Sequence, residues 1–163
     1  MSENKRVAVY LRFEVMPDEQ ATSFMGHYDY YKSIIKEHEG WQLTEFYVDE
    51  GPAKNQEEFK RLLHDCKSGK IDLVYARSTA RFGKNVIDAV QTAKDLSHLE
   101  PPVGVYFEQE NLNSLDKDSY FMLSVWLLFG LAERQHRSEI QKRARQRKLD
   151  SLSRTKEEGV GND

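Results

Sequence analysis

The chain has 163 residues and a formal net charge of −3, with 39% hydrophobic and 31% charged residues, as expected for one ordinary domain with a buried core. A single cysteine, Cys66, excludes an internal disulfide framework and suits a reducing compartment. No apolar signal segment follows the N-terminus, and the most apolar run, residues 120–132, is too short to span a membrane. We therefore expect a cytoplasmic protein without a membrane partner.

Strand-like and helical patterns alternate along most of the chain. In chain order, they predict a strand over 6–12, a helix over 22–38, a strand over 43–48, a helix over 56–67, a strand over 71–76, a helix over 85–98, a strand over 103–108 and a long helix from about 117 to 149. This alternation with short connections predicts an α/β fold, in which a mostly parallel sheet carries helices on both faces.

One domain is predicted, over residues 1–149, and the long helix ends it. The remaining residues, 150–163, are polar and show no periodicity. Segments of this composition cannot bury enough apolar surface to fold. We therefore expect a disordered tail there and no second domain.

Sites of parallel α/β sheets lie at the carboxyl ends of strands, here the loops after Arg12, Val48, Ala76 and Glu108, and three of these four strand ends offer candidate site residues. Arg12 and Glu14 end the first strand, residues 76–85 follow the third, and residues 108–111 follow the fourth. Arg12, Arg81 and Lys84 would together bind a phosphate group near the start of the helix at residue 85. The alternative is that these cations are surface residues paired to acids.

The first part of the long helix is apolar almost all round. A helix of this kind must be covered on every side, and one sheet covers only one side. A second copy of the chain is the natural cover for the other. The predicted dimer interface consists of Phe121, Val125, Leu128, Phe129, Ala132 and Ile140. The alternative is a helix buried wholly within one chain.

The second part of the long helix is strongly basic. Residues 134–148 hold seven basic side chains against one acid, Glu139. A basic stretch on an otherwise acidic chain is typical of proteins that contact a nucleic-acid backbone. The alternative is a solvated helix end. The predicted DNA-binding residues are Arg134, Arg137, Lys142, Arg143, Arg145, Arg147 and Lys148.

Five collinear segments, together covering about residues 5–149, resemble one protein family. They are RVAVYLRFE, FYVDEG, GKIDLVYARSTARFGKN, GVYFEQENLNSLD and LLFGLAERQHRSEI. In this respect the chain is similar to the catalytic domain of serine recombinases, the group of resolvases, invertases and large serine integrases.

The resemblance implies a definite chemistry. Family members cut DNA with a serine hydroxyl, form a 5′-phosphoserine link, and need neither a metal nor another cofactor. Arginines hold the scissile phosphate, and the long helix drives dimer and then tetramer formation while its basic end crosses the DNA minor groove. The family's separate DNA-binding domain is not expected in this chain.

Four positions match the family's motif: Arg12 and Arg81 match two phosphate-holding arginines, and Glu133 and Arg134 match residues of the long helix. The resemblance implies the same roles for them here.

Other positions depart from the motif. The nucleophile position falls on Glu14, or on Met16 in a second alignment, and neither residue has a hydroxyl. Further arginine positions fall on Gln56 and Lys84, and the Asp or Ser before the third-strand arginine falls on Ala80. Because this phosphoryl transfer needs a hydroxyl in line with the leaving group, we expect a remnant site, formed by Arg12, Glu14, Arg81 and Lys84, that does not cleave DNA.

The sequence therefore predicts an accessory or regulatory dimer that binds DNA weakly and pairs with an active recombinase. Glu14 would satisfy Arg12 and Arg81 as an internal anion. Two alternatives remain open. One is an active recombinase that uses an unexpected nucleophile, such as Ser78 or Ser23, or lacks its DNA-binding domain, and the other is a protein-interaction scaffold without DNA binding. No metal site is expected, because the five histidines show no ligand spacing.

Overall fold

The computed structural model describes residues 4–14, 21–52 and 56–159, without the side chains of 21–23 and 157–158. Its elements are β1 (Lys5–Phe13), α1 (Ala21–Glu37), β2 (Trp41–Glu50), α2 (Glu57–Lys67), β3 (Leu73–Ala76), the 3-10 turn η2 (Thr79–Arg81), α3 (Val86–Ser97), β4 (Gly104–Phe107), β5 (Leu112–Asn113) and α4 (Lys117–Gly159). The chain divides into two units, which we call the body, up to Leu127, and the distal helix, from Leu128 onward.

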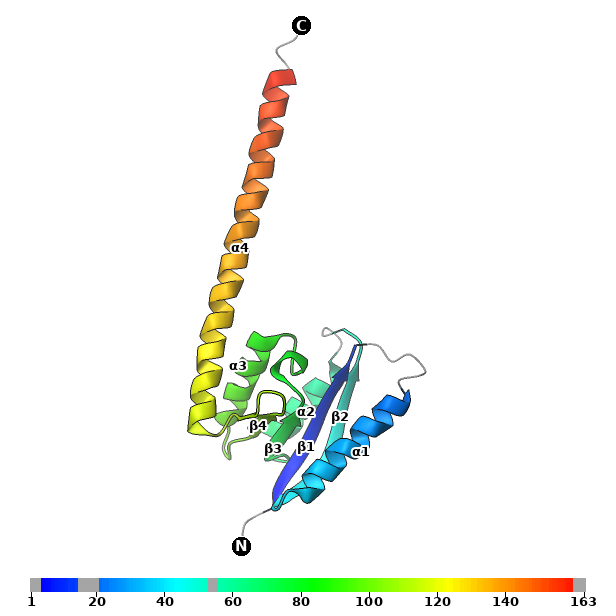
Figure 1. Cartoon of the computed structure of the whole chain (residues 1–163). Helices are drawn as coiled ribbons and strands as arrows, with labels where there is room; N and C mark the ends of the chain where they lie inside the picture. Colours follow the sequence, from blue (N-terminus) through cyan, green and yellow to red (C-terminus); the bar gives the residue numbers. More distant parts are fainter. Residues whose placement is uncertain (1–3, 15–20, 53–55, 160–163) are drawn as a thin grey trace. The chain divides into compact units, whose positions relative to one another are not determined.

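The body is built on one sheet with the strand order β2-β1-β3-β4-β5 (Figure 1). β1 lies parallel to both β2 and β3, β3 lies parallel to β4, and only the short β5 is antiparallel. The predicted α/β fold is confirmed. Because β1, β3 and β4 are parallel neighbours, their carboxyl ends meet at one edge of the sheet.

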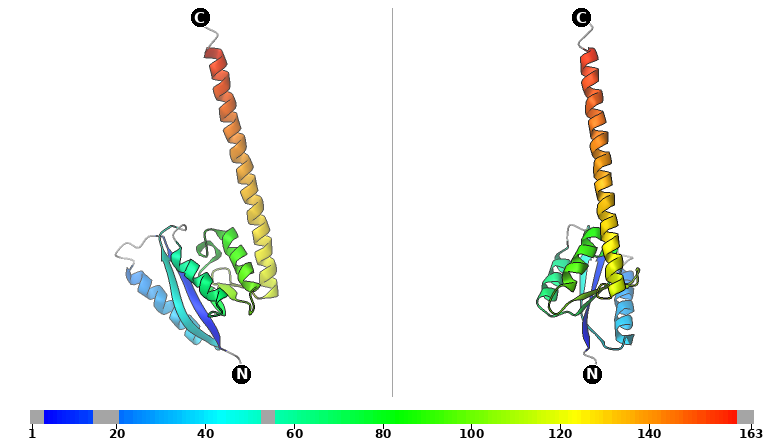
Figure 2. Two further views of the ribbon diagram at one scale, coloured as in Figure 1. Left: turned by 180° about the vertical axis from the view of Figure 1, so that it is seen from behind. Right: turned by 90° about the vertical axis from the view of Figure 1, so that its left-hand side faces the viewer.

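Helices cover both faces of this sheet, as Figure 2 shows from behind and from the side. Strand β1, which lies between β2 and β3, alternates, so that Ala8 and Tyr10 pack on one face while Val7 and Val9 pack on the other. The first face is covered by α2, α3 and the start of α4, and the second by α1 through the buried side chains of Tyr31 and Ile35. The two cores fix the strand ends between them.

The long helix α4 begins at Lys117, as predicted, but continues to Gly159 instead of ending at residue 149. The disordered tail expected from residue 150 is therefore wrong as far as Gly159. The segment contains good helix formers and no proline, and Gln146 donates a hydrogen bond to Asp150 one turn later, at 2.9 Å. The residues after 149 have no apolar stripe, so hydrophobic periodicity does not indicate that they are helical. None of the helices in the described ranges is long and apolar enough to cross a membrane.

Candidate functional site

The segment after β3, residues 77–84, is held at both ends, and we call it the Arg loop. Ser78 is extended, Thr79–Arg81 form the 3-10 turn, and Gly83 has a φ of +85°, a conformation that favours glycine. Phe82 is completely buried and packs edge-on against the rings of Tyr10, Phe59 and Phe107. This anchor fixes the position of Arg81, which directly precedes it.

The end of β1 meets the Arg loop through two contacts. The Nη2 of Arg12 donates a hydrogen bond to the carbonyl oxygen of Ala80 at 3.2 Å. An Nη1 of Arg81 lies 3.5 Å from a carboxylate oxygen of Glu14, and these two side chains are 38% and 70% exposed. The structure thus brings together three of the four predicted remnant-site residues.

Arg12 has one buried donor nitrogen, Nε, without a partner among the described residues, although a buried donor of this kind is normally paired. Glu14 pairs with Arg81, while the described contact of Arg12 is to the backbone. The expected internal anion between both arginines is not seen among the described contacts, because Glu14 pairs with Arg81 alone and is 70% exposed.

Lys84 lies on the α2–α3 side of the Arg loop. It lines a hollow of about 480 Å³ together with Gln56, Phe59, Asp88 and four other residues. Gln56 is 5% exposed, and its Nε2 donates to the carbonyl oxygen of Gly83 at 2.9 Å. Gln56 thus braces the Arg loop, and one N–H of its amide is engaged in doing so.

The carboxylate of Asp49, at the end of β2, is a site residue that sequence reasoning missed. It is 5% exposed and accepts three hydrogen bonds, from the Tyr10 hydroxyl at 3.0 Å and from the backbone N–H groups of Glu58 and Phe59 at 3.0 and 2.9 Å. Asp49 thereby caps the first turn of α2 from another element. No local capping motif reveals this contact in the sequence.

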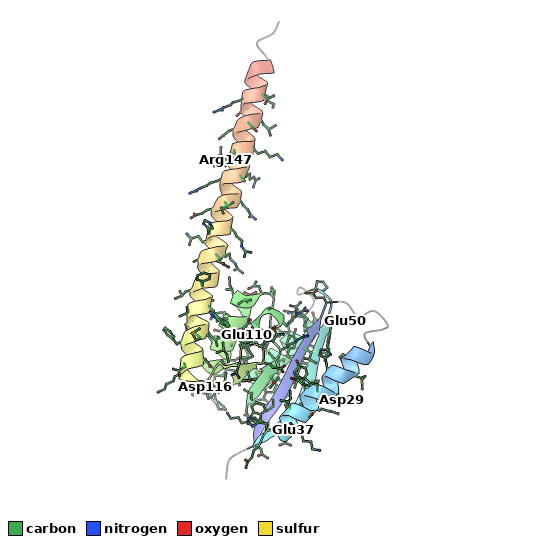
Figure 3. All side chains as sticks on the ribbon, in the orientation of Figure 1. Asp29, Glu37, Glu50, Glu110, Asp116 and Arg147 are labelled. Carbon is green, nitrogen blue, oxygen red and sulfur yellow. The ribbon has the colours of Figure 1, made fainter. Side chains whose placement is uncertain are left out.

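Two carboxylates stand at the carboxyl end of β4. An Oε1 of Glu110 accepts from the N–H of Thr79 at 3.0 Å and from its hydroxyl at 2.8 Å (Figure 3). The Oε1 of Glu108 accepts from the Tyr30 hydroxyl at 3.3 Å. The second carboxylate oxygen of each is buried without a partner among the described residues. At the end of β4, which the sequence predicts to carry site residues, Glu110 thus binds the Arg loop through Thr79.

Of the two rival nucleophiles, the structure describes the side chain of Ser78. Ser78 is only 3% exposed, which keeps its hydroxyl from an approaching phosphate. The side chain of Ser23 and all of Met16 lie outside the described residues.

Burial raises the pKa of the Cys66 thiol to about 12, so this thiol stays protonated and weakly nucleophilic. Within the described ranges, no three His, Cys, Asp or Glu side chains cluster as metal ligands.

The start of α4 has a buried and an exposed side. Leu123 is completely buried, and Trp126 and Leu127 pack against the same core. Phe121 and Val125 are 67% and 40% exposed. In the distal helix the remaining predicted interface residues, Leu128, Phe129, Ala132 and Ile140, are also exposed.

The predicted DNA-binding residues all lie in the distal helix, and all are exposed; Figure 3 labels Arg147 among them. Glu133 and Arg137 approach to 3.9 Å, one turn apart on the same helix. That spacing and exposure make a weak surface pair, which leaves the guanidinium of Arg137 accessible.

Comparison with known proteins gives one family and three solved structures. Residues 7–151 match the family model described as "Resolvase, N terminal domain". A resolvase family site-specific recombinase from Streptococcus pneumoniae is similar with 21% identity and a TM-score of 0.65, over 88% of this chain and 97% of that one. No curated protein sequence matches the chain.

Two further structures share the fold. The N-terminal catalytic domain of TP901-1 integrase is 22% identical with a TM-score of 0.58, over 80% of this chain and 98% of that one. The C-terminal catalytic domain of ISC1926 TnpA, an IS607-like serine recombinase, is 12% identical with a TM-score of 0.50, over 79% and 84% of the two chains.

Proposed function

The chain belongs to the resolvase family of serine recombinases, and from this premise we propose that it takes part in DNA recombination as a dimer that binds DNA without cutting it. The proposal is carried by the side chain of Glu14, which the resemblance places at the nucleophile position. Glu14 is 70% exposed there and lies 3.5 Å from Arg81. A carboxylate occupies the surface at which a scissile phosphate would have to approach.

The chemistry of strand cleavage argues in the same direction. The family's reaction needs a hydroxyl oxygen in line with the leaving group, and Glu14 has none. Its negative charge also repels a phosphodiester, at a cost of about 1 kcal/mol for two unit charges about 4 Å apart in water. Gln56 gives its amide to Gly83, so two positions of the family's site have other tasks here.

DNA binding rests on the basic part of the distal helix. Its seven predicted contact residues keep exposed cationic heads, and such groups bind phosphates with little dependence on sequence. The binding is therefore weak, salt-sensitive and sequence-tolerant. An active recombinase partner would select the site.

Dimerisation rests on the exposed apolar side chains of α4. Within the body, Phe121, Met122 and Val125 are 67%, 41% and 40% exposed, and exposed apolar patches of this kind mark interaction surfaces. A second copy of the chain is the occupant we propose, because resolvase family proteins dimerise and the apolar residues continue along the same helix to Ile140. The same surface supports pairing with a related recombinase, or a tetramer.

A second candidate is an active recombinase. It is favoured by Arg12 and Arg81, which remain at the strand ends and are linked through the Arg loop. This function needs a hydroxyl from another part of the chain or from a partner. A pure interaction scaffold is the third candidate, and it predicts no binding to duplex DNA at low salt.

A trapping experiment distinguishes the first two. Purified protein is mixed with nicked suicide duplexes of randomised sequence, so that site choice does not limit the reaction, and the products are run on a denaturing gel. We expect no covalent protein–DNA adduct, while a recombinase of the same family on its own site serves as positive control. Any adduct through a side chain of this chain overturns the proposal. Glu14→Ser is run beside the wild type, and it should also fail, because Lys84 and Gln56 are unchanged.

A further inference from the structure

The backbone ladder between β3 and β4 continues past the ends of both strands. The N–H of Glu108 donates to the carbonyl oxygen of Ala76 at 3.0 Å, and the N–H of Gln109 donates to that of Arg77, also at 3.0 Å. The next link is made by a side chain: Oε1 of Glu110 accepts from the N–H of Thr79 at 3.0 Å. Glu110 thus completes the ladder at the point where the backbone of the Arg loop turns away.

The 3-10 turn of the Arg loop needs an acceptor at its start. The first N–H groups of a helical turn lack partners within the turn, and a serine before the turn usually supplies an oxygen. Ser78 occupies that place but makes no side-chain capping bond. Glu110 supplies the missing acceptor from another element, and it also accepts from the Thr79 hydroxyl at 2.8 Å.

The turn that presents Glu110 is itself well fixed. The N–H of Asn111 donates to the carbonyl oxygen of Glu108 at 3.1 Å, and the Oδ1 of Asn111 accepts from the Tyr106 hydroxyl at 2.6 Å. Asn111 has a φ of +51°, which asparagine tolerates better than most residues. The carboxylate of Glu110 therefore stands in one place, and the described contact of Glu108 is with another residue, the Tyr30 hydroxyl.

Arg81 lies between two anchors, the carboxylate of Glu110 at the start of the turn and the buried ring of Phe82 at its end. We propose that Glu110 is a positioning residue, which acts through Thr79 to hold the guanidinium of Arg81 where a DNA phosphate is bound. The proposal goes beyond the proposed function, in which DNA binding rests on the distal helix and the charge of Glu14 beside Arg81 weakens phosphate binding there without abolishing it. The contacts of Glu110 with Thr79 themselves do not depend on DNA.

Three variants and a control test it. Glu110→Ala removes the acceptor, Glu110→Gln keeps a neutral oxygen, and Thr79→Val keeps the N–H but removes the hydroxyl. Glu37→Ala is the control, an exposed acid at the other end of the sheet (Figure 3). Each protein is measured for hydrogen exchange of the Thr79 amide, for the shift of the Arg81 Nε–H resonance on titration with inorganic phosphate, and for melting temperature.

In Glu110→Ala the Thr79 amide should exchange at least about tenfold faster, since it loses a bond to a charged acceptor. Phosphate should bind Arg81 about tenfold more weakly, as expected for loss of one such bond. Glu110→Gln should recover most of the wild-type protection of the Thr79 amide and most of the phosphate affinity. Thr79→Val should be intermediate in both, and Glu37→Ala should match the wild type. The amides of β3 should keep their protection in all four variants.

Several results would overturn the proposal. One is a Thr79 amide that stays protected in Glu110→Ala. Another is a loss of phosphate affinity that follows the loss of melting temperature from variant to variant and is not rescued by Glu110→Gln. That pattern would describe a residue that only stabilises the fold. If Glu110→Ala does not fold, Thr79→Val decides, and an unchanged Arg81 response there contradicts the proposal. A wild type whose Arg81 does not respond to phosphate contradicts the binding part of this proposal but leaves the proposed function intact, and the exchange of Thr79 still reports on the contact with Glu110.

Discussion

The guanidinium of Arg81 lies 3.5 Å from the carboxylate of Glu14, and the two side chains are 38% and 70% exposed. An ion pair this open to water contributes only about 0 to 1 kcal/mol to stability. Arg12 reaches the carbonyl oxygen of Ala80 instead. Glu14 therefore acts on the site mainly through its charge, which occupies Arg81, and little through the stability of the fold.

Glu14→Gln removes that charge and keeps the size of the side chain. We expect the free energy of unfolding to change by less than about 1 kcal/mol. The affinity for non-specific duplex DNA at low salt should rise about fivefold, which corresponds to the repulsion of about 1 kcal/mol between two unit charges about 4 Å apart in water. Fluorescence anisotropy with a labelled duplex measures the second effect.

Glu37→Gln is the matched control, because Glu37 is also exposed but lies at the opposite end of the sheet (Figure 3). It removes the same charge from the chain as a whole. An equal rise in both variants would attribute the effect to net charge and contradict a local role for Glu14. A loss of several kcal/mol of stability in Glu14→Gln would instead favour a buried internal anion.

Periodicity in the sequence predicts the four parallel strands of the sheet, but neither the strand order nor the short antiparallel β5. The alternation of β1 assigns Tyr10 to one face and Val9 to the other, and these faces carry the two cores. The strand ends follow from that, and Arg12 and Arg81 were expected at the same edge for this reason. In α4, apolar periodicity was the wrong guide, because the helix continues to Gly159 through polar residues.

The contacts that hold the Arg loop could not be predicted in this way. Asp49 caps α2 from nine and ten residues away, and Glu110 holds Thr79 across 31 positions. A capping motif is visible only when the acceptor directly precedes the turn. Gln56 shows the same limit, because its hydrogen bond to the carbonyl oxygen of Gly83 joins residues 27 positions apart in the sequence.

The exposed apolar side of α4 predicts a self-associating chain. Val125→Asp and Phe129→Asp each place a charge within the predicted interface, where desolvation of an unpaired carboxylate costs several kcal/mol. We expect the dimer dissociation constant to rise at least about a hundredfold, as measured by analytical ultracentrifugation. Leu152→Asp is the control, since Leu152 is 56% exposed on the same helix but lies outside the predicted set. The prediction would be contradicted if Val125→Asp and Phe129→Asp had the same sedimentation mass as the wild type at every protein concentration.

The basic residues of the distal helix predict a steep salt dependence of DNA binding. Each phosphate contact that is lost should lower the slope of log affinity against log salt by about 0.9. Arg145→Gln with Arg147→Gln should therefore reduce the slope by roughly 2, equally for unrelated duplexes. Lys36→Gln, an exposed cation at the end of α1, should leave it unchanged. A slope that does not respond to the double substitution would remove the distal helix from the DNA-binding surface.

The buried carboxylate of Asp65 links stability to pH. It accepts from the Tyr47 hydroxyl at 2.7 Å and from the Lys70 ammonium at 3.0 Å, and these bonds hold the pKa of Asp65 below its usual range. Since its unfolded pKa is about 3.9, the stabilisation is fully present above about pH 4 and is lost as the pH falls through the lower folded value. Asp65→Asn should cost about 1 to 3 kcal/mol at neutral pH, measured by urea denaturation.

The test of that linkage is the difference in unfolding free energy between wild type and Asp65→Asn as the pH is lowered. It should be constant from neutral pH down to about pH 4 and shrink below it, because only the wild type has to protonate Asp65. Asp29→Asn is the control, since Asp29 is exposed on α1 (Figure 3), and it should differ from the wild type by the same small amount at every pH. A difference for Asp65→Asn that persists undiminished in acid would mean that the side chain stabilises the fold by its shape and hydrogen bonds alone, with no contribution from its charge.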